Sequence, residues 1–195
     1  MGYELLKVRI EGLTPTIMHN GHLADPTNQW TRAIKVITSK SAKKKTDVDF
    51  EELVRLEWYG GLYVDEDGAP CWPGENIESM IKSGARTQAK GKEVEKGLLC
   101  VGNWPLIFDG PKTVDELWDL DPAYRLTKPA KVNQSKIMRT RPIFPQCKLA
   151  FELQWNAAYF NREQLEHWLA VAGTDIGLSD WRPKYGRFRV LEVSA

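Results

Sequence analysis

The chain has 195 residues, 42% of them hydrophobic and 27% charged, and its formal net charge is +1. This balance is typical of one soluble globular domain and excludes a disordered or fibrous protein. Because the chain is not globally basic, any binding to nucleic acid has to come from local basic patches.

Neither a membrane nor a secreted location is expected. No segment approaches the roughly 18 apolar residues of a membrane span, and the first residues lack the apolar core of a signal peptide. Cys71, Cys100 and Cys147 are odd in number and far apart, which fits neither a disulfide framework nor a paired-cysteine metal site. We therefore expect a cytoplasmic protein with reduced, buried thiols, no cofactor and no metal.

In chain order, residues 3–10 alternate between apolar and polar side chains, as a half-buried strand does, and residues 13–18 form a second apolar run. The loop that follows carries His19, His22 and Asp25, three residues apart. These residue types suit a metal site or acid–base chemistry. A non-helical loop does not bring side chains at this spacing together, so the alternative is that they form surface hydrogen bonds near a turn.

Residues 30–38 have apolar side chains at helical spacing. The basic segment 39–45 follows, either as a solvated connection or as a phosphate contact by its lysines. A second helix is predicted from Asp47, as its N-cap, to a stop at Gly60-Gly61. Its apolar face is predicted to carry Phe50, Leu53, Val54 and Trp58.

An Asp-Gly turn within residues 62–72 predicts a hairpin. Residues 73–86 predict a helix whose amino end offers free N–H groups. Gly84 in the interior of this helix indicates that another element packs closely there. An interrupted strand is predicted at residues 98–108, and Thr113 is predicted to cap a short helix.

The segment from residue 124 to residue 144 contains six cations and no acidic residue, which is the clearest charge segregation in the chain. One interpretation is an exposed strand pair that its charges keep soluble. The other is a hairpin or arm that contacts nucleic acid. The six cations are Arg125, Lys128, Lys131, Lys136, Arg139 and Arg141.

The last part of the chain predicts a strand at residues 148–155 and a helix that Asn161 caps and Gly173 ends. A glycine-containing loop follows at residues 176–190. Gly177 and Gly186 can bring main-chain N–H groups close to a ligand. The loop also supplies charge and flat faces for stacking, through Arg182, Lys184, Arg187, Trp181 and Tyr185. The alternative is a β-turn with a solvated basic face.

Antiparallel strands interleaved with two main helices predict an α+β fold. We expect a ferredoxin-like or RRM-like antiparallel sheet with helices on one face and a basic hairpin insertion. The whole chain, 1–195, is expected to be a single domain with insertions at about 19–60 and 124–144.

Three segments are similar, in order, to motifs of one protein family. They are Gly12-Leu-Thr-Pro-Thr-Ile-Met18, residues 72–86 beginning Trp72-Pro-Gly, and Ile176-Gly-Leu-Ser-Asp-Trp-Arg-Pro-Lys-Tyr-Gly-Arg-Phe188. They resemble the RAMP superfamily of CRISPR-associated proteins, particularly the backbone subunits that coat guide RNA in effector complexes. The chain differs at Glu75-Asn-Ile-Glu-Ser79, where the family usually has Ser-Ser-Leu-Lys-Gly, and it is short for such a subunit. A stand-alone phage or mobile-element relative fits the same motifs.

The resemblance implies that residues 128–143 form a thumb-like hairpin, which folds over nucleic acid between neighbouring protomers. We therefore predict a sequence-independent nucleic-acid-binding subunit, with RNA or single-stranded DNA as partner, that joins copies of itself head to tail and contacts other effector-complex subunits. Phosphate contacts are predicted for Arg86, Arg182, Lys184 and Arg187, and clamping of a neighbour's strand for Lys131, Lys136, Arg139 and Arg141.

Two alternatives come from other classes of protein. The first is a RAMP-type endoribonuclease that uses the loop of His19, His22 and Asp25. The second is a viral structural protein, which would assemble without nucleic acid.

Overall fold

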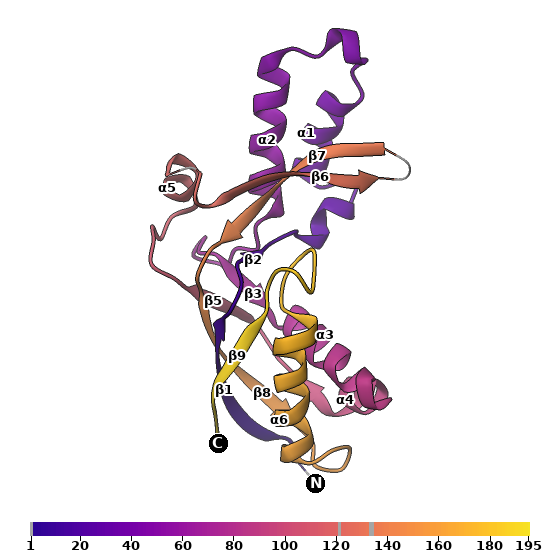
Figure 1. The fold of residues 1–195 in the computed structure, drawn as a ribbon, viewed down its shortest axis with the longest axis vertical. Coiled ribbons are helices and arrows are strands. Elements are labelled where there is room, and N and C mark those ends of the chain that lie inside the picture. Colours follow the sequence, from indigo (N-terminus) through magenta and orange to yellow (C-terminus); the bar gives the residue numbers. More distant parts are fainter. Residues whose placement is uncertain (1, 121, 133–134) are drawn as a thin grey trace.

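The computed structural model describes residues 2–120, 122–132 and 135–195. It is a mixed α+β structure in which the described strand pairs are antiparallel, as the sequence predicts. The molecule is elongated (Figure 1). A helix-covered sheet, here called the core sheet, forms its lower part in that view, and a smaller upper sheet lies beside two helices.

The core sheet has the strand order β3-β5-β8-β1-β9, and β4 pairs with β8 outside this path. The alternation predicted for the first strand is confirmed, because Leu6, Val8 and Ile10 are buried and Lys7 between them is exposed. The strands of this sheet are β1 (Glu4–Gly12), β3 (Cys71–Pro73), β4 (Leu98–Leu99), β5 (Asn103–Ile107), β8 (Lys148–Trp155) and β9 (Phe188–Ser194).

Helices α3 (Gly74–Ala85) and α6 (Arg162–Val171) cover one face of the core sheet and contact each other (Figure 1). The close approach predicted at Gly84 is confirmed, because a Cβ at that position would lie 2.5 Å from the carbonyl oxygen of Trp168 in α6. Asn161 caps α6 as predicted. The end predicted at Gly173 is wrong, since the turn Ala172–Ile176 prolongs the helix to Gly177.

The upper sheet has the order β2-β7-β6, with β2 (Thr16–Ile17), β6 (Arg125–Val132) and β7 (Ser135–Phe144). Strands β6 and β7 pair along their length, from Arg125 opposite Pro142 to Val132 opposite Ser135. The strand pair predicted for the basic segment is therefore confirmed. We call residues 125–144 the arm.

Helices α1 (Gln29–Thr38) and α2 (Asp47–Gly61) pack together, and α2 contacts β7 of the arm. Two details of the α2 prediction are wrong. Thr46 is the N-cap in place of Asp47, because its side chain accepts the Asp49 N–H and the Asp49 carboxylate accepts the Thr46 N–H in return. Phe50 is 51% exposed, so the buried face begins further along the helix.

The remaining described elements are short. The hairpin predicted at residues 62–72 is reduced to a single bridge between Val64 and Pro70. Thr113 caps its helix as predicted. The short helices are α4 (Gly91–Gly97) and α5 (Val114–Asp119), and the short turns are Gly21–Ala24, Ala42–Lys44 and Arg86–Gln88. Among the described residues, no helix combines the length and apolar character that crossing a membrane requires.

Candidate nucleic-acid interface

The arm and the glycine-containing loop, two segments that the sequence analysis identified separately, lie against each other. The Lys128 ammonium donates to the Tyr185 hydroxyl over 2.9 Å. The Arg141 Nε donates to the Asp180 Oδ2 over 3.2 Å. We call residues 177–187 the loop. Basic residues about fifty positions apart along the chain therefore share one surface.

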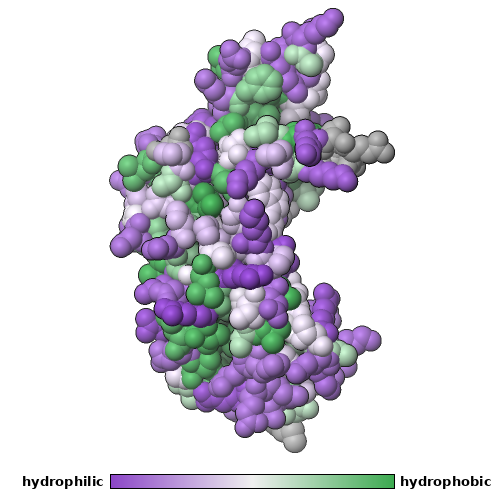
Figure 2. All heavy atoms as spheres, in the orientation of Figure 1, coloured by the Kyte–Doolittle hydropathy of each residue, from purple (hydrophilic) through white to green (hydrophobic). Residues whose placement is uncertain are grey.

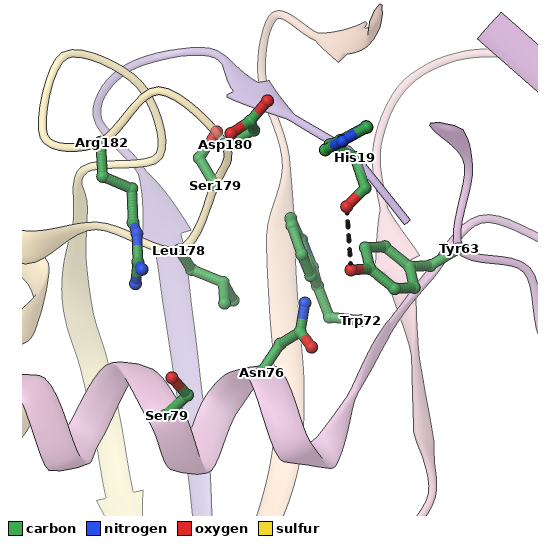
Figure 3. A pocket seen from close by; sticks show the side chains of 9 residues that line it. All are labelled: His19, Tyr63, Trp72, Asn76, Ser79, Leu178, Ser179, Asp180 and Arg182. Atoms are coloured by element: carbon green, nitrogen blue, oxygen red, sulfur yellow. Dashed lines mark hydrogen bonds between the residues drawn. The ribbon is translucent and has the colours of Figure 1, made fainter. Parts of the chain in front are cut away.

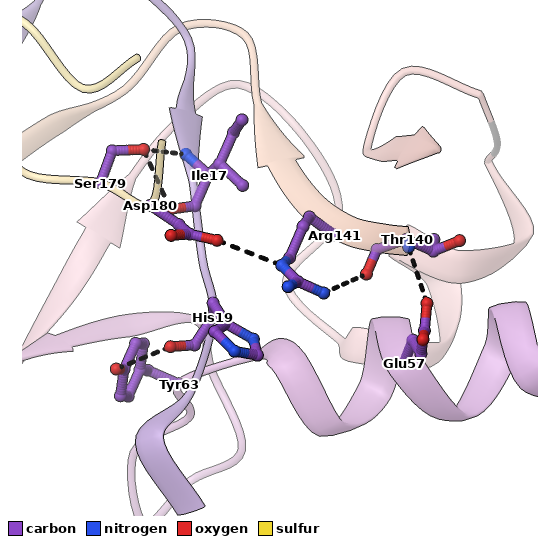
Figure 4. A network of polar contacts seen from close by, with 8 residues as sticks. All are labelled: Ile17, His19, Glu57, Tyr63, Thr140, Arg141, Ser179 and Asp180. Atoms are coloured by element: carbon purple, nitrogen blue, oxygen red, sulfur yellow. Dashed lines mark hydrogen bonds and ion pairs between the residues drawn. The ribbon is translucent and has the colours of Figure 1, made fainter. Parts of the chain in front are cut away.

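Arg139 and Arg141 have partners inside the molecule, which departs from the expectation that both face a nucleic acid. Arg141 is 8% exposed and pairs with Asp180 (Figure 4). Arg139 forms an ion pair with Glu57 of α2. The other carboxylate oxygen of Glu57 accepts the Thr140 N–H over 2.8 Å. Since breaking such buried contacts is costly, we remove both arginines from the set of phosphate contacts.

The loop uses its glycine N–H groups internally, which is also a departure from expectation. Gly177 donates to the Ala172 carbonyl over 2.7 Å and Gly186 to the Pro15 carbonyl over 2.9 Å. Both glycines have positive φ, at 86° and 77°. Glycine is needed here for the path of the backbone, because the N–H groups are already bonded and are not available to a ligand.

The two aromatic residues of the loop differ in availability. Tyr185 is 8% exposed and its hydroxyl is bonded to Lys128, so its ring is not free for a base to stack on. Trp181 is half-buried and its φ is +52°, in the left-handed region that bulky residues rarely adopt. The Arg141 guanidinium lies 6.0 Å from the centre of the Trp181 ring, which fixes that side chain beside the arm.

Several predicted cations remain exposed on the arm and the loop. In the part of the chain that the structure describes, no carboxylate forms an ion pair with any of them. They are Lys131 and Lys136 of the arm and Arg182, Lys184 and Arg187 of the loop. A polyanion can therefore contact them without breaking an ion pair within the described residues.

Arg86 lies elsewhere. It follows the carboxyl end of α3 and, with Lys82 and Glu95, lines a separate hollow between α3 and α4. Lys82 and Glu95 form an ion pair of 3.0 Å there. No described contact joins Arg86 to the arm or the loop, so the predicted surface forms without it.

A pocket of about 200 Å³ lies between the loop and the first two turns of α3 (Figure 3). The Tyr63 hydroxyl donates to the His19 carbonyl over 3.1 Å at one side of it. Partial removal from water and then the positive charge of Arg141 lower the pKa of His19 from its ordinary value. The pocket is lined by His19, Tyr63, Trp72, Asn76, Ser79, Leu178, Ser179, Asp180 and Arg182.

The other two residues of the predicted histidine loop have structural partners. The His22 Nε2 lies 2.8 Å from the Gly60 carbonyl, to which it donates. The Asp25 carboxylate accepts the N–H and hydroxyl of Thr27, and these hydrogen bonds lower the pKa of Asp25. Within the described ranges, no group of three or more His, Cys, Asp or Glu side chains could hold a metal ion. The three predicted residues do not form one cluster.

The thiols of Cys71, Cys100 and Cys147 are free. Cys71 and Cys100 are buried as predicted, and Cys147 is half-buried. Burial raises the pKa of Cys71 to about 11, that of Cys100 to about 12 and that of Cys147 to about 11. These thiols are therefore protonated at neutral pH and poor nucleophiles.

The uncovered face of the core sheet does not resemble a base-stacking surface. Arg9 pairs with Glu192 across β1 and β9 at 3.6 Å. Glu11 forms ion pairs with Lys148 and Arg189 of the flanking strands. Since these charges already have partners on the sheet itself, this face offers fewer unpaired cations to a strand of nucleic acid than the arm and the loop do.

Two residues that sequence reasoning missed hold the surface together. Asp180 is the one acidic residue of the loop, and its position among cations was a signal for an internal ion pair. Glu57 is 4% exposed and lies between Leu56 and Trp58, which are buried as well. A carboxylate on an apolar helix face needs a partner, and this could have suggested an arginine from another element.

No protein-family model matches this chain, and a comparison with curated proteins gives no match either. We therefore infer function from the geometry and charge of the site itself.

Proposed function

We propose that this chain binds a single strand of nucleic acid, RNA in the first place, through its phosphates, on the surface where the arm meets the loop. The observation that carries the proposal is the contact between these two segments through Lys128 and Tyr185 and through Arg141 and Asp180. It brings the three exposed cations of the loop beside the base of the arm, whose outer half carries two more, and none of the five has a carboxylate partner among the described residues. Phosphates are the natural counter-charge for such a surface.

The outline of the molecule agrees with this role. In the view of Figure 2 the right-hand side is hollowed between the arm above and the α3–α4 end of the core below. The loop faces this hollow in the same orientation (Figure 1). A strand lying in the hollow would run past the loop, which carries Arg182, Lys184 and Arg187. Because the proposed contacts are to phosphates, binding is independent of base sequence for most of the strand.

The connectivity of the core sheet supports a ferredoxin-like, RRM-like type of fold as part of the proposal. The relevant part of the sheet has the strand order β9-β1-β8-β5. In the chain, helix α3 lies between β1 and β5, and α6 lies between β8 and β9. These are two β-α-β units, each with a strand of the other unit between its two strands, so that neighbouring strands in the sheet are antiparallel. The arm is then an insertion before β8, where the RAMP resemblance implies a thumb-like hairpin. A cytoplasmic nucleic-acid-binding subunit of that superfamily, or a stand-alone relative, is the identity we propose.

Self-association head to tail is the second part of the proposal. The arm projects from the body (Figure 1), and Lys131 and Lys136 lie on its outer half. Cations at that distance from the loop of the same copy are suited to contact a strand that a neighbouring copy holds. A head-to-tail contact repeats without closing, so it would extend along the strand.

Binding of labelled single-stranded RNA at several salt concentrations tests the proposal. The variants neutralise two cations each, Lys131→Gln with Lys136→Gln in the arm and Arg182→Gln with Lys184→Gln in the loop. The slope of the logarithm of the association constant against the logarithm of the salt concentration is negative. Each pair should make this slope less negative by roughly 1.4 if both cations contact phosphates, at about 0.7 for each phosphate of a single strand.

The matched control neutralises Lys7 and Lys112, which are exposed on β1 and just before α5, outside the arm, the loop and the α3–α4 end of the core. It changes net charge equally and should keep the wild-type slope. Equal slopes in all three double variants would overturn the proposed surface. The absence of RNA binding by the wild-type protein would overturn the function.

A further inference from the structure

The pocket between the loop and α3 lies where it can bind one chemical group of a strand that lies on the loop. Arg182 is both an exposed cation of the proposed surface and part of the pocket lining. At about 200 Å³, the pocket is smaller than the roughly 300 Å³ at which sites for drug-sized ligands begin. Its size therefore suits one flat ring system.

The walls of the pocket combine flat apolar surfaces with fixed polar groups. Tyr63 and Trp72 lie with ring centres 5.4 Å apart at one side, and Leu178 faces them from the loop (Figure 3). Ser179 is held by the backbone of Ile17, to which its hydroxyl donates over 3.0 Å. Asp180 is held by Arg141. These polar groups are already oriented before any ligand enters.

Asn76 is a polar residue of the lining whose side chain is not held by such a partner in the described ranges. Its side-chain amide points into the pocket in Figure 3, and it forms no hydrogen bond with another residue in the described ranges. A carboxamide offers a donor and an acceptor side by side. This pair matches the adjacent acceptor and donor on the edge of adenine, the base that asparagine contacts in this way in nucleic-acid complexes.

The charge of the pocket suits an uncharged ring with an anionic group at its side and disfavours a metal ion. Asp180 is neutralised by Arg141, and the lowered pKa of His19 keeps its imidazole neutral at pH 7. Arg182 lies at one side and is the cation of the lining. A nucleobase in the pocket with its own phosphate on Arg182 satisfies this distribution.

We propose that this pocket binds one nucleobase of the bound strand, with a preference for adenine through Asn76. The inference rests on the proposed function, since the strand is delivered by the phosphate contacts of the loop. It adds one position of base recognition to binding that is otherwise independent of sequence. Removing a base from its neighbours in the strand has a stacking cost, which the Asn76 contact and the aromatic wall would offset.

The test compares RNA strands of equal length and charge: oligo(A), oligo(U) and a strand whose sugars carry no bases. Wild-type protein should bind oligo(A) about tenfold more tightly than the abasic strand, because one good pair of base contacts is worth about 1–3 kcal/mol. The Asn76→Ala variant should lose most of the preference for oligo(A) over oligo(U). Its salt dependence should be unchanged, since no phosphate contact is removed.

The control variant is Asn103→Ala, which removes an exposed amide from β5 outside the pocket and should keep the wild-type preference. Equal affinity of the wild-type protein for oligo(A) and the abasic strand would overturn the inference and leave the proposed function intact. A preference that survives in Asn76→Ala would overturn the role of that residue. Salt-independent or absent binding of every strand would instead overturn the proposed function.

Discussion

The core sheet and the arm are held in place by different interactions. Beneath α3 and α6 the contacts are apolar and close, with Ile77, Met80 and Leu165 fully buried. Where the arm meets the rest of the molecule, the fixed contacts are ionic and hydrogen-bonded, through Glu57 to Arg139 and Thr140 and through Asp180 to Arg141. A basic hairpin thus has its base secured by acidic partners, while its outer half stays cationic.

This difference shows that a local excess of positive charge in a sequence can include cations with carboxylate partners in other elements as well as exposed ones. Of the six cations in the arm, Arg139 and Arg141 have carboxylate partners in other elements. The charge on Lys131 and Lys136 remains exposed. The ion-paired cations lie at the base of the arm and the exposed cations on its outer half, and separate experiments on each kind can break or sharpen the comparison.

The largest effect is expected in the core, at Gly74. A Cβ at this first residue of α3 would overlap the carbonyl oxygen of Cys100, a backbone atom that cannot rotate away. Gly74→Ala should therefore lower the free energy of unfolding by about 3 kcal/mol, at the upper end for overpacking. Urea denaturation measures this. The control is Gly21→Ala, where nothing lies within 4 Å of the added carbon and the change should stay within about 0.5 kcal/mol.

A smaller effect is expected at the base of the arm, from Glu57→Ala. The Thr140 N–H would lose its buried acceptor and Arg139 its partner. We expect a loss of about 2 kcal/mol, because an unsatisfied buried donor costs about 1–3 kcal/mol and Arg139 retains access to water.

Glu57→Gln is the matched variant for this prediction. Its amide oxygen can still accept the Thr140 N–H, so the loss should be clearly smaller than for Glu57→Ala. Hydrogen exchange of the Thr140 amide should accelerate in the alanine variant more than in the glutamine variant. Unchanged protection of that amide in Glu57→Ala would contradict the idea that this carboxylate holds the arm on α2.

The smallest effect is a pH dependence where the arm and the pocket meet. The pKa of His19 is lowered in the folded protein, so on acidification the unfolded chain takes up a proton at this histidine first. The free energy of unfolding should therefore fall as pH decreases through about 6.5, the ordinary histidine value, and this loss should stop below the folded pKa.

His19→Gln should flatten that part of the stability curve, measured as the urea midpoint between about pH 7.5 and about pH 5.5, a range that spans the ordinary histidine pKa. His167→Gln, which replaces an exposed imidazole on α6, is the control and should leave the contribution of His19 in place. A His19→Gln curve that runs parallel to the wild-type curve over this range would show that the His19 ring is not desolvated.

The elements of the core could be predicted because their signals are local. Alternation placed Leu6, Val8 and Ile10 on the buried face of a strand, helical spacing placed Ile77, Met80 and Ile81, and Gly84 indicated close packing. Burial follows from the period of the side chains within one element. The limits of elements were less certain, as at Thr46 and Gly173, because the end of a helix depends on hydrogen bonds to residues outside it.

The sequence by itself determined that two segments of this chain are basic and that one of them forms a strand pair. Only the tertiary structure decided that these segments touch, and which of their cations have partners. Whether an arginine faces solvent or a carboxylate depends on what lies opposite it, and Glu57 is 82 residues from Arg139. The pocket beside Asn76 is likewise made by residues from four separate stretches. Its shape depends on how those stretches pack together, which their local periodicity does not determine.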